Sequence, residues 1–317
     1  MPAKIPTRFP EARLAQALAE EGGLRSLPKS DVHCHALLNG PLSAYEEVLG
    51  HKLPSPPPRF RAFAEFGEYL TANLFPATRT LDGMRALVRA GLERMADEGV
   101  VYAEASIDLL LPLHIHASPR AVIELVAEER DRIAPRMEFA PEIGINRRVP
   151  PDRLWPSFVA HVESGVFRGI DLYDDERSGD LREFQRFYRL ARERGLALKA
   201  HAGEICGPER VRETLEILEV DAIQHGIAAA DDPRLMDELA RRGTQLNLAL
   251  ASNIALGVAG AYERHPIHTL LAAGVNVALG TDDFTLFGVG LCDEILRLRR
   301  AGMPIRELAK LRLGPPA

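Results

Sequence analysis

The sequence has few cysteines, no excess of basic residues and no long apolar run. Its three cysteines, Cys34, Cys206 and Cys292, are too few for a disulfide framework, which indicates a reducing compartment. The net charge of −6 leaves no basic surplus for the nucleic-acid backbone, so no polynucleotide partner is expected. No run of about 18 apolar residues or signal-peptide core occurs. We therefore expect a cytoplasmic protein that does not bind a membrane and acts on a small molecule.

The 317 residues contain 46% apolar and 26% charged residues, an ordinary balance for a globular protein. We expect one domain over residues 1–317. A charged helix is expected from Glu11 to Glu21. Eight short apolar or β-branched runs alternate with longer helical patterns, and these predict strands at 31–35, 100–106, 138–145, 166–172, 196–201, 221–225, 244–250 and 275–281.

Glycines separate many of the helical patterns from the strands that follow. Gly99, Gly195, Gly243 and Gly274 each stand where a helix should stop, because glycine adopts the left-handed conformation at little cost. Repeated helix–glycine–strand units indicate parallel strands, and eight of them favour an α/β fold of the (β/α)₈ barrel type. An open, doubly wound sheet is the alternative. The proline-rich stretch 51–58 predicts a loop over the barrel mouth.

The first polar cluster at a predicted strand end is Asp31-Val32-His33-Cys34-His35. Barrel enzymes keep their sites at the carboxyl ends of the strands. Residues two apart in a strand point to the same side, so His33 and His35 face the barrel axis and can share one metal. Alternatively, both histidines are satisfied by hydrogen bonds in the core.

The fifth and sixth predicted strands also end in polar residues. His201 ends the fifth strand and Glu204 follows it, while His225 ends the sixth. The structural alternative for Glu204 is a polar turn in which the next helix N-terminus favours a carboxylate. A single histidine such as His225 is also common in structural roles.

The eighth predicted strand ends in Asp282 and Asp283. Two adjacent carboxylates after a buried apolar run are costly unless they bind something, although a helix cap near Gly288 is an alternative. Taken together, three histidines and one aspartate at strand ends form a mixed nitrogen and oxygen site suited to zinc. The groups left over are those needed to activate a water and to protonate a leaving nitrogen.

These motifs resemble the signature of the adenosine/adenine deaminase family within the amidohydrolases. The resemblance covers about residues 27 to 300. It rests on His33-x-His35, His201-Ala-Gly-Glu204, His225-Gly226 and Thr281-Asp282-Asp283, supported by Gly169-Ile170-Asp171-Leu172, Val101-Tyr102-Ala103-Glu104, Ser252-Asn253 and His265-Pro266-Ile267. The other type of deaminase zinc site uses a Cys-x-x-Cys pair, which this chain does not contain.

The resemblance implies a hydrolytic deaminase with one zinc ion per chain, and it implies roles for individual residues. The zinc ligands would be His33, His35, His201 and Asp282. His225 would orient a water and help to take its proton, and Glu204 would protonate a ring nitrogen. Asp283 would hydrogen-bond the heterocycle and the attacking oxygen, and Gly203 would lie against the ring edge. Ammonia would then leave.

The chain departs from the family pattern mainly where substrate is expected to bind. Leu37 or Asn39 stands where relatives carry an acidic residue that reads the sugar or its replacement. Tyr173-Asp174 stands where relatives place a glycine whose amide contacts a ring nitrogen, and Ser106 replaces an arginine. We expect Leu37, Asn39, Tyr173 and Asp174 to contact the substrate. The alternative is local drift with the substrate unchanged.

Several functions fit these observations. The first is deamination of an adenosine-like or adenine-like aminopurine or a modified purine. The alternatives are a pterin-like or guanine-like heterocycle, an amide or cyclic-amide hydrolase with the same zinc site, and a non-enzymatic relative. Glu204, His225 and Asp283 argue against lost catalysis, and an amide hydrolase would not need Glu204.

Plain adenosine is expected to be a poor substrate. If Asp174 points inward and is ionised, it can only accept hydrogen bonds and would repel a ring nitrogen that offers a lone pair. Tyr173 could stack on a heterocycle. Asp174 pointing to solvent is the open alternative.

Overall fold

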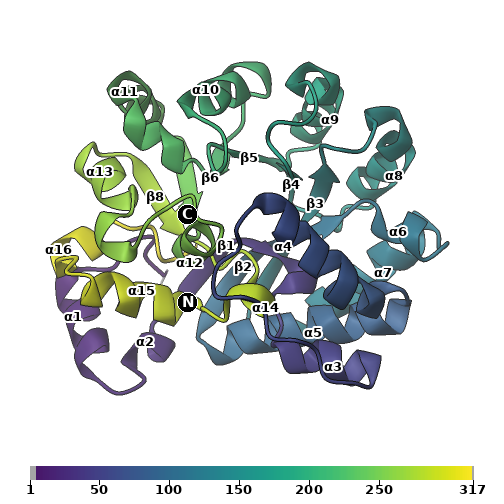
Figure 1. Ribbon diagram of the computed structural model, residues 1–317, viewed down its shortest axis with the longest axis horizontal. Coiled ribbons are helices and arrows are strands. Elements are labelled where there is room, and N and C mark those ends of the chain that lie inside the picture. The colour runs from purple at the N-terminus through teal and green to yellow at the C-terminus, as the bar shows by residue number, and fades with distance from the viewer. Residues whose placement is uncertain (1–4, 316–317) are drawn as a thin grey trace.

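Eight parallel strands form the centre of the molecule, and helices surround them (Figure 1). The computed structural model describes residues 5–315. The strands pair in chain order: β1 (Lys29–His35), β2 (Val100–Asp108), β3 (Glu138–Asn146), β4 (Gly169–Tyr173), β5 (Ala197–Ala202), β6 (Ala222–His225), β7 (Gln245–Leu248) and β8 (Asn276–Leu279). All eight predicted strands are present. The seventh is shorter than the predicted 244–250 because helix α12 begins at residue 250.

The sheet closes on itself between β1 and the residues that follow β8. The Asp282 amide donates to the His33 carbonyl at 2.8 Å, and the His35 amide donates to the Asp282 carbonyl at 3.3 Å. A Cβ atom on residue 280 would lie 2.4 Å from the His33 Cβ atom, so glycine is required for this approach. The fold is therefore a (β/α)₈ barrel, and the open sheet is excluded.

The predicted N-terminal helix is present as Glu11–Ala19, and the four predicted helix stops are confirmed. Gly99, Gly195, Gly243 and Gly274 all have positive φ, between +69° and +85°, which confirms them as helix stops. The α-helices are α1 (Glu11–Ala19), α2 (Gly23–Ser26), α3 (Leu42–Leu49), α4 (Phe63–Tyr69), α5 (Leu81–Asp97), α6 (Leu111–His114), α7 (Pro119–Ile133), α8 (Pro151–Glu163), α9 (Leu181–Glu193), α10 (Pro208–Ile217), α11 (Pro233–Arg242), α12 (Leu250–Ala255), α13 (Ile267–Ala272), α14 (Phe284–Phe287), α15 (Leu291–Arg300) and α16 (Ile305–Leu308). The short helices are η1 (Ala36–Leu38), η2 (Leu70–Leu74, a π-helix), η3 (Phe75–Thr78), η4 (Ile227–Asp231) and η5 (Tyr262–Arg264).

A second, smaller core lies beside the main barrel core. It is formed largely by the segment between β1 and α5, with Tyr45, Phe60 and Leu74 fully buried. Residues 51–58 have no helix or strand, as predicted, but they do not line the central cavity. The cavity wall is built by the residues after that loop, in α4, η2 and η3.

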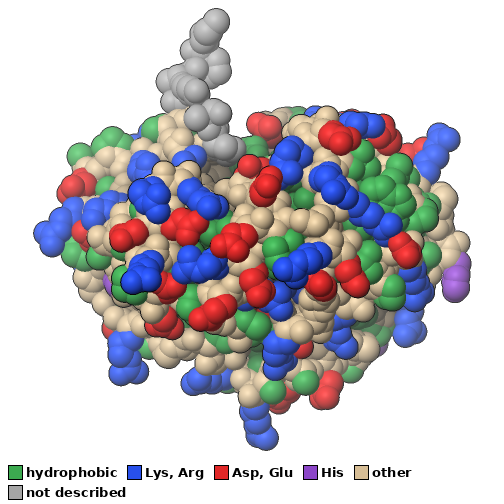
Figure 2. Space-filling model, turned by 90° about the horizontal axis from the view of Figure 1, so that it is seen from above, with side chains coloured by type: hydrophobic (Ala, Val, Ile, Leu, Met, Phe, Trp, Pro, Cys, Tyr) green, Lys and Arg blue, Asp and Glu red, His purple; other side chains and the backbone are tan. Residues whose placement is uncertain are grey.

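Figure 2 shows one face of the molecule, on which acidic and basic side chains are interspersed. Within residues 5–315, none of the helices combines the length and the apolar composition needed to cross a bilayer.

Candidate active site

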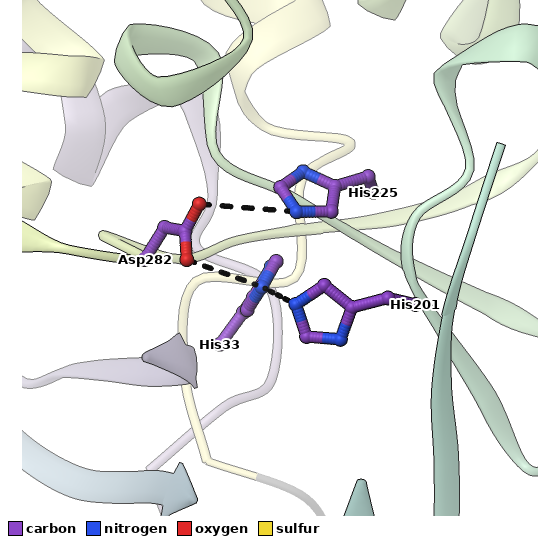
Figure 3. Close-up of side chains that lie close together, drawn as sticks. All are labelled: His33, His201, His225 and Asp282. Carbon is purple, nitrogen blue, oxygen red and sulfur yellow. Dashed lines mark hydrogen bonds and ion pairs between the residues drawn. The ribbon is translucent and has the colours of Figure 1, made fainter. Parts of the chain in front are cut away.

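Four histidines and one aspartate meet at the carboxyl ends of the strands. The Nε2 atoms of His33 and His201 lie 3.2 Å apart (Figure 3). Asp282 places Oδ1 3.8 Å from His33 Nε2 and 3.3 Å from His35 Nε2, and its Oδ2 lies 3.8 Å from His225 Nε2. The side chains that the sequence placed at four separate strand ends therefore form one cluster.

Two residues of this cluster have a left-handed backbone. His225 has φ +64° and Asp282 has φ +54°, although neither is a glycine. Such a conformation costs on the order of 1–3 kcal/mol per residue and persists only where the surrounding structure imposes it. For Asp282 the imposing contacts are the two backbone hydrogen bonds that close the barrel. Barrel closure thus aims the Asp282 carboxylate at the histidines.

Hydrogen bonds behind the cluster show that it fits a metal ion. His33 Nδ1 lies 2.9 Å from the Asn247 carbonyl oxygen, and His201 Nδ1 lies 3.0 Å from Asp171 Oδ1. Both partners are acceptors, so each Nδ1 carries a proton, and Nε2 is the ring atom that each histidine can offer to a metal ion. Burial lowers the pKa of His33 to about 3, so its ring is neutral. Two Nε2 atoms that lie 3.2 Å apart, each held by a hydrogen bond at Nδ1, are suited to bind one cation together.

The charges in the cluster also favour a bound cation. Although burial opposes protonation, Asp283 and Asp282 raise the pKa of His35 to about 10. Without a metal, His35 therefore supplies the positive charge that the two carboxylates require. Its Nδ1 lies 2.7 Å from Ser106 Oγ, so the serine at the position of the family's arginine orients this ring.

His225 has the tautomer opposite to that of His33 and His201. It is set by a chain of hydrogen bonds through His265 and Asn253, which we call the relay. The Ile267 amide donates to His265 Nδ1 at 3.1 Å, so neutral His265 carries its proton on Nε2 and donates to Asn253 Oδ1 at 3.3 Å. The Asn253 amide group then donates to His225 Nδ1 at 3.0 Å. Burial lowers the pKa of His265 to about 3 and that of His225 well below its ordinary value, so both rings are neutral.

The relay places the proton of His225 on Nε2, facing the site. This atom lies 3.4 Å from Glu204 Oε1. One ligand atom from each of His33, His201, His225 and Asp282 lies within 4.8 Å of the others, and the predicted ligand His35 forms a second such group with Asp282 and Asp283. A protonated Nε2 cannot ligate a metal, so the tautomer favours His35 over His225 as a ligand.

Two buried carboxyl groups have unpaired oxygens in the cavity. Glu204 Oε1 and Asp283 Oδ1 have no hydrogen-bond partner among residues 5–315. Burial, together with Asp282, Glu176 and Asp283, raises the pKa of Glu204 well above its ordinary value, and burial and Asp282 also raise the pKa of Asp283. The Glu204 carboxyl group thus combines a raised pKa, which favours its protonated form, with an open oxygen. The Asp283 side chain does not cap α14, and α15, the helix that begins after Gly288, has its N-cap at Gly290, so the helix-cap alternative is wrong.

Glu176 holds the turn that carries Glu204, and the sequence did not identify this role. Its carboxylate accepts hydrogen bonds from the amides of Gly203 at 2.6 Å, Glu204 at 2.7 Å and Ile205 at 2.9 Å. Its side chain is buried. The Glu204 side chain therefore starts from a backbone fixed by three charge-assisted hydrogen bonds. Arg147 holds the neighbouring strand end by donating to the His201 carbonyl at 2.6 Å.

A cavity of about 900 Å³ opens above the cluster and is lined by three of the expected substrate residues, Leu37, Tyr173 and Asp174. The Tyr173 ring stands edge-on to His35, with ring centroids 5.0 Å apart. Asp174 has φ +77°, the conformation that a glycine would adopt. Its Oδ2 accepts from Asn146 at 2.7 Å and its Oδ1 from the Asp175 amide at 2.6 Å. Both carboxylate oxygens are thus occupied.

Two expected substrate contacts are corrected by the structure. Asn39 is completely buried and does not line the cavity, because its side chain binds Arg94 and lies against Met95. Gly203 also lies outside the cavity lining, and its amide is already bound to Glu176. Its φ of +70° and a Cβ position 2.4 Å from Val211 Cγ2 show that the turn itself requires glycine.

The chain is similar in sequence to known proteins. The sequence pattern described as adenosine deaminase matches residues 57–313. A protein of Treponema pallidum named "Putative adenosine/adenine deaminase" is 30% identical over 284 residues, covering 90% of this chain and 95% of that protein.

Solved structures of the same fold are also similar. The adenine deaminase from Arthrobacter aurescens superposes with a TM-score of 0.78 at 24% identity, covering 89% of this chain and 90% of that one. An amidohydrolase from Burkholderia ambifaria, solved with bound zinc, superposes with a TM-score of 0.74 at 22% identity and covers 90% of this chain and 84% of that one.

Proposed function

The chain belongs to the adenosine deaminase family and is a hydrolytic deaminase acting on carbon–nitrogen bonds, and we propose that it uses one zinc ion to deaminate an aminopurine or modified purine. The observation that carries this proposal is the buried Glu204, with a raised pKa and an open oxygen, beside a group of histidines and Asp282 suited to hold a cation. A carboxylic acid held neutral in this way can donate a proton to a ring nitrogen.

The residues that would hold the zinc are His33, His35, His201 and Asp282. Their number and their mixture of nitrogen and oxygen donors suit zinc, and the Asn247 and Asp171 hydrogen bonds leave the Nε2 atoms of His33 and His201 free to bind it. The bound ion supplies Lewis-acid activation of water. The same kind of ion is present in the amidohydrolase from Burkholderia ambifaria, which supports the choice of metal.

The remaining residues position water and substrate and move protons. Glu204 donates its proton to a ring nitrogen as the water oxygen adds to the amino-bearing carbon. The Glu204 carboxylate left behind takes back one proton of the water, the other water proton passes to the amino group, and the carbon–nitrogen bond breaks as ammonia leaves. Asp283 uses its open Oδ1 to hydrogen-bond the attacking oxygen.

His225 orients the attacking oxygen by donating from Nε2–H. The resemblance had also implied that His225 helps to take a proton from water. The tautomer set by Asn253 and His265 leaves no lone pair at Nε2, so we do not assign that second role.

Adenosine is proposed to be a poor substrate, but on different grounds from those offered by the sequence. Both Asp174 oxygens already have donors, so repulsion of a ring nitrogen no longer carries the argument. Leu37 does, because it lines the cavity where relatives carry an acidic residue and cannot bind a sugar hydroxyl.

Ammonia release from a panel of aminopurines, aminopteridines and cyclic amides tests the proposal. We expect release from at least one aminopurine, with adenosine below a kcat/KM of about 10⁵ M⁻¹s⁻¹ and surpassed by another compound. Hydrolysis of a cyclic amide without any ammonia release from the amino-heterocycles would assign the site to the other class of hydrolase. Adenosine as the best substrate would show that the pocket changes are drift.

A further inference from the structure

The cavity above the metal cluster has a polar floor and an apolar upper wall. The floor contains His35, His201, His225, Glu204, Asp282 and Asp283. The wall is built by Phe63 and Phe66 of α4, Phe75 of η3, and leucines that flank them. The leucines are Leu37, Leu38, Leu70, Leu110, Leu111 and Leu256. One end of a bound molecule therefore meets acids and imidazoles, and the other meets aromatic and aliphatic side chains.

The rim of this wall is unusually exposed. Between residues 5 and 315, the exposed large hydrophobic side chains are Phe75 at 43% and Leu113 at 42%. Phe75 lines the cavity, and Leu113 belongs to α6, whose neighbouring residues Leu111 and His114 also line it. Exposed apolar side chains gathered at the mouth of a cavity mark a place where an apolar ligand group is buried.

The basic side chains at the cavity are already paired with carboxylates. The Arg177 guanidinium binds Asp175 through two hydrogen bonds of 2.8 and 2.9 Å. Arg148 lies 3.8 Å from Asp174 Oδ1. No lysine is present in the lining. A phosphate group would have to compete with these carboxylates for its cations, so a phosphorylated substrate is disfavoured.

The chemistry fixes which part of the substrate meets the apolar wall. The amino-bearing carbon must lie at the floor, where Glu204 and the metal ligands are. The edge of the purine that carries a sugar or other substituent then points away from the floor, toward α4 and η3. A volume of about 900 Å³ lies at the upper end of the range for drug-sized ligands, so a bare base leaves most of it empty.

We propose that the preferred substrate is an uncharged aminopurine derivative whose substituent, remote from the reacting amine, ends in an apolar aryl or alkyl group held by Phe63, Phe66 and Phe75. This inference rests on the proposed deaminase function and refines its substrate class. The apolar wall binds this group, and the paired arginines select against a phosphate at the same place.

Steady-state kinetics on adenine, adenosine, adenosine 5′-monophosphate and 5′-deoxy-5′-(phenylthio)adenosine test this proposal. We expect the phenylthio compound to exceed adenosine in kcat/KM by about 10–100-fold, which corresponds to about 1.4–2.7 kcal/mol at 1.36 kcal/mol per factor of ten. The monophosphate should fall below adenosine.

Substitutions in the wall locate the effect. Phe75→Ala and Phe66→Ala should each lower the ratio of kcat/KM for the phenylthio compound to kcat/KM for adenosine and remove most of the advantage of the phenylthio compound. Because Phe75 is exposed, its substitution leaves the core intact. Tyr69→Ala is the matched control, since Tyr69 lies on the same helix and its ring is near Phe60 but does not line the cavity. It should retain the preference.

The outcomes separate this proposal from the function on which it rests. If adenosine or its monophosphate is deaminated at least as well as the phenylthio compound, the apolar-group proposal is overturned and deamination stands. If the preference exists but survives both phenylalanine substitutions, the assigned wall is wrong. If none of the four compounds releases ammonia, the proposed function falls together with the inference.

Discussion

Replacing Glu176 by glutamine tests how the turn carrying the general acid is held. The Glu176 carboxylate accepts three backbone amides, two on Oε1 from Glu204 and Ile205 and one on Oε2 from Gly203. A glutamine keeps one carbonyl oxygen, which can serve Glu204 and Ile205. Its amide group then meets the Gly203 N–H, and two donors face each other.

The size of the effect follows from that lost contact. A hydrogen bond to a charged group contributes about 1.5–3 kcal/mol, and 1.36 kcal/mol corresponds to a factor of ten. The aligned position of Glu204 should therefore be about 10–100-fold less populated. We expect kcat to fall by this factor, while zinc content stays unchanged. A shift of about 1 Å at a catalytic group is enough for such a loss.

A double-mutant cycle with Glu204→Gln separates positioning from general stability. If Glu176 acts through Glu204, the double variant should have the kcat of Glu204→Gln within about threefold, because the acid is already gone. Multiplication of the two single effects would refute the reasoning. Glu129→Gln is the matched control, since Glu129 is a buried glutamate that also accepts three hydrogen bonds but lies on the outer helix α7. It should leave kcat unchanged.

Two further predictions concern the metal cluster and the tautomer relay. Metal analysis of the purified protein should find about one zinc per chain, and His33→Ala should lose most of it. If the wild-type protein holds no metal and the variant does not differ from it, the ligand assignment is wrong. Asn253→Asp should keep the zinc but lower kcat by about 10²–10⁴-fold. An ionised Asp can only accept a hydrogen bond, so the ring proton of His225 moves to Nδ1 and Nε2 no longer carries one. Wild-type turnover in Asn253→Asp would show that the tautomer of His225 does not matter.

The fold could be predicted because local signals repeat along the chain. Several apolar runs follow a helix that stops at a glycine, and the alternation of side chains in β1 placed His33 and His35 on one side. The end of the seventh strand was predicted less accurately. Residues 249 and 250 continue the apolar pattern, but β7 ends at Leu248 and α12 begins at Leu250. Barrel closure at Gly280 depends on contact with His33, which lies far away in the sequence.

The parts of the site that the sequence missed depend on distant partners. Asn39 was predicted to contact substrate because it closely follows the first metal-binding motif. In the structure its side chain accepts a hydrogen bond from Arg94 of α5 and is buried away from the cavity. The tautomer of His225 requires Asn253 and His265, which the sequence offered only as motif residues without a role. Glu176 lies two residues after Asp174, yet its role depends on reaching the turn after β5.

The most direct test of the central claim measures zinc content and ammonia release on the same samples of wild-type protein and Glu204→Gln. The account predicts equal zinc in both proteins, ammonia release from an aminopurine by the wild type, and turnover lower by about 10²–10⁴-fold in the variant. Near-wild-type ammonia release by zinc-loaded Glu204→Gln would contradict the assignment of Glu204 as the proton donor. No ammonia release by zinc-loaded wild-type protein would contradict the proposed substrate class.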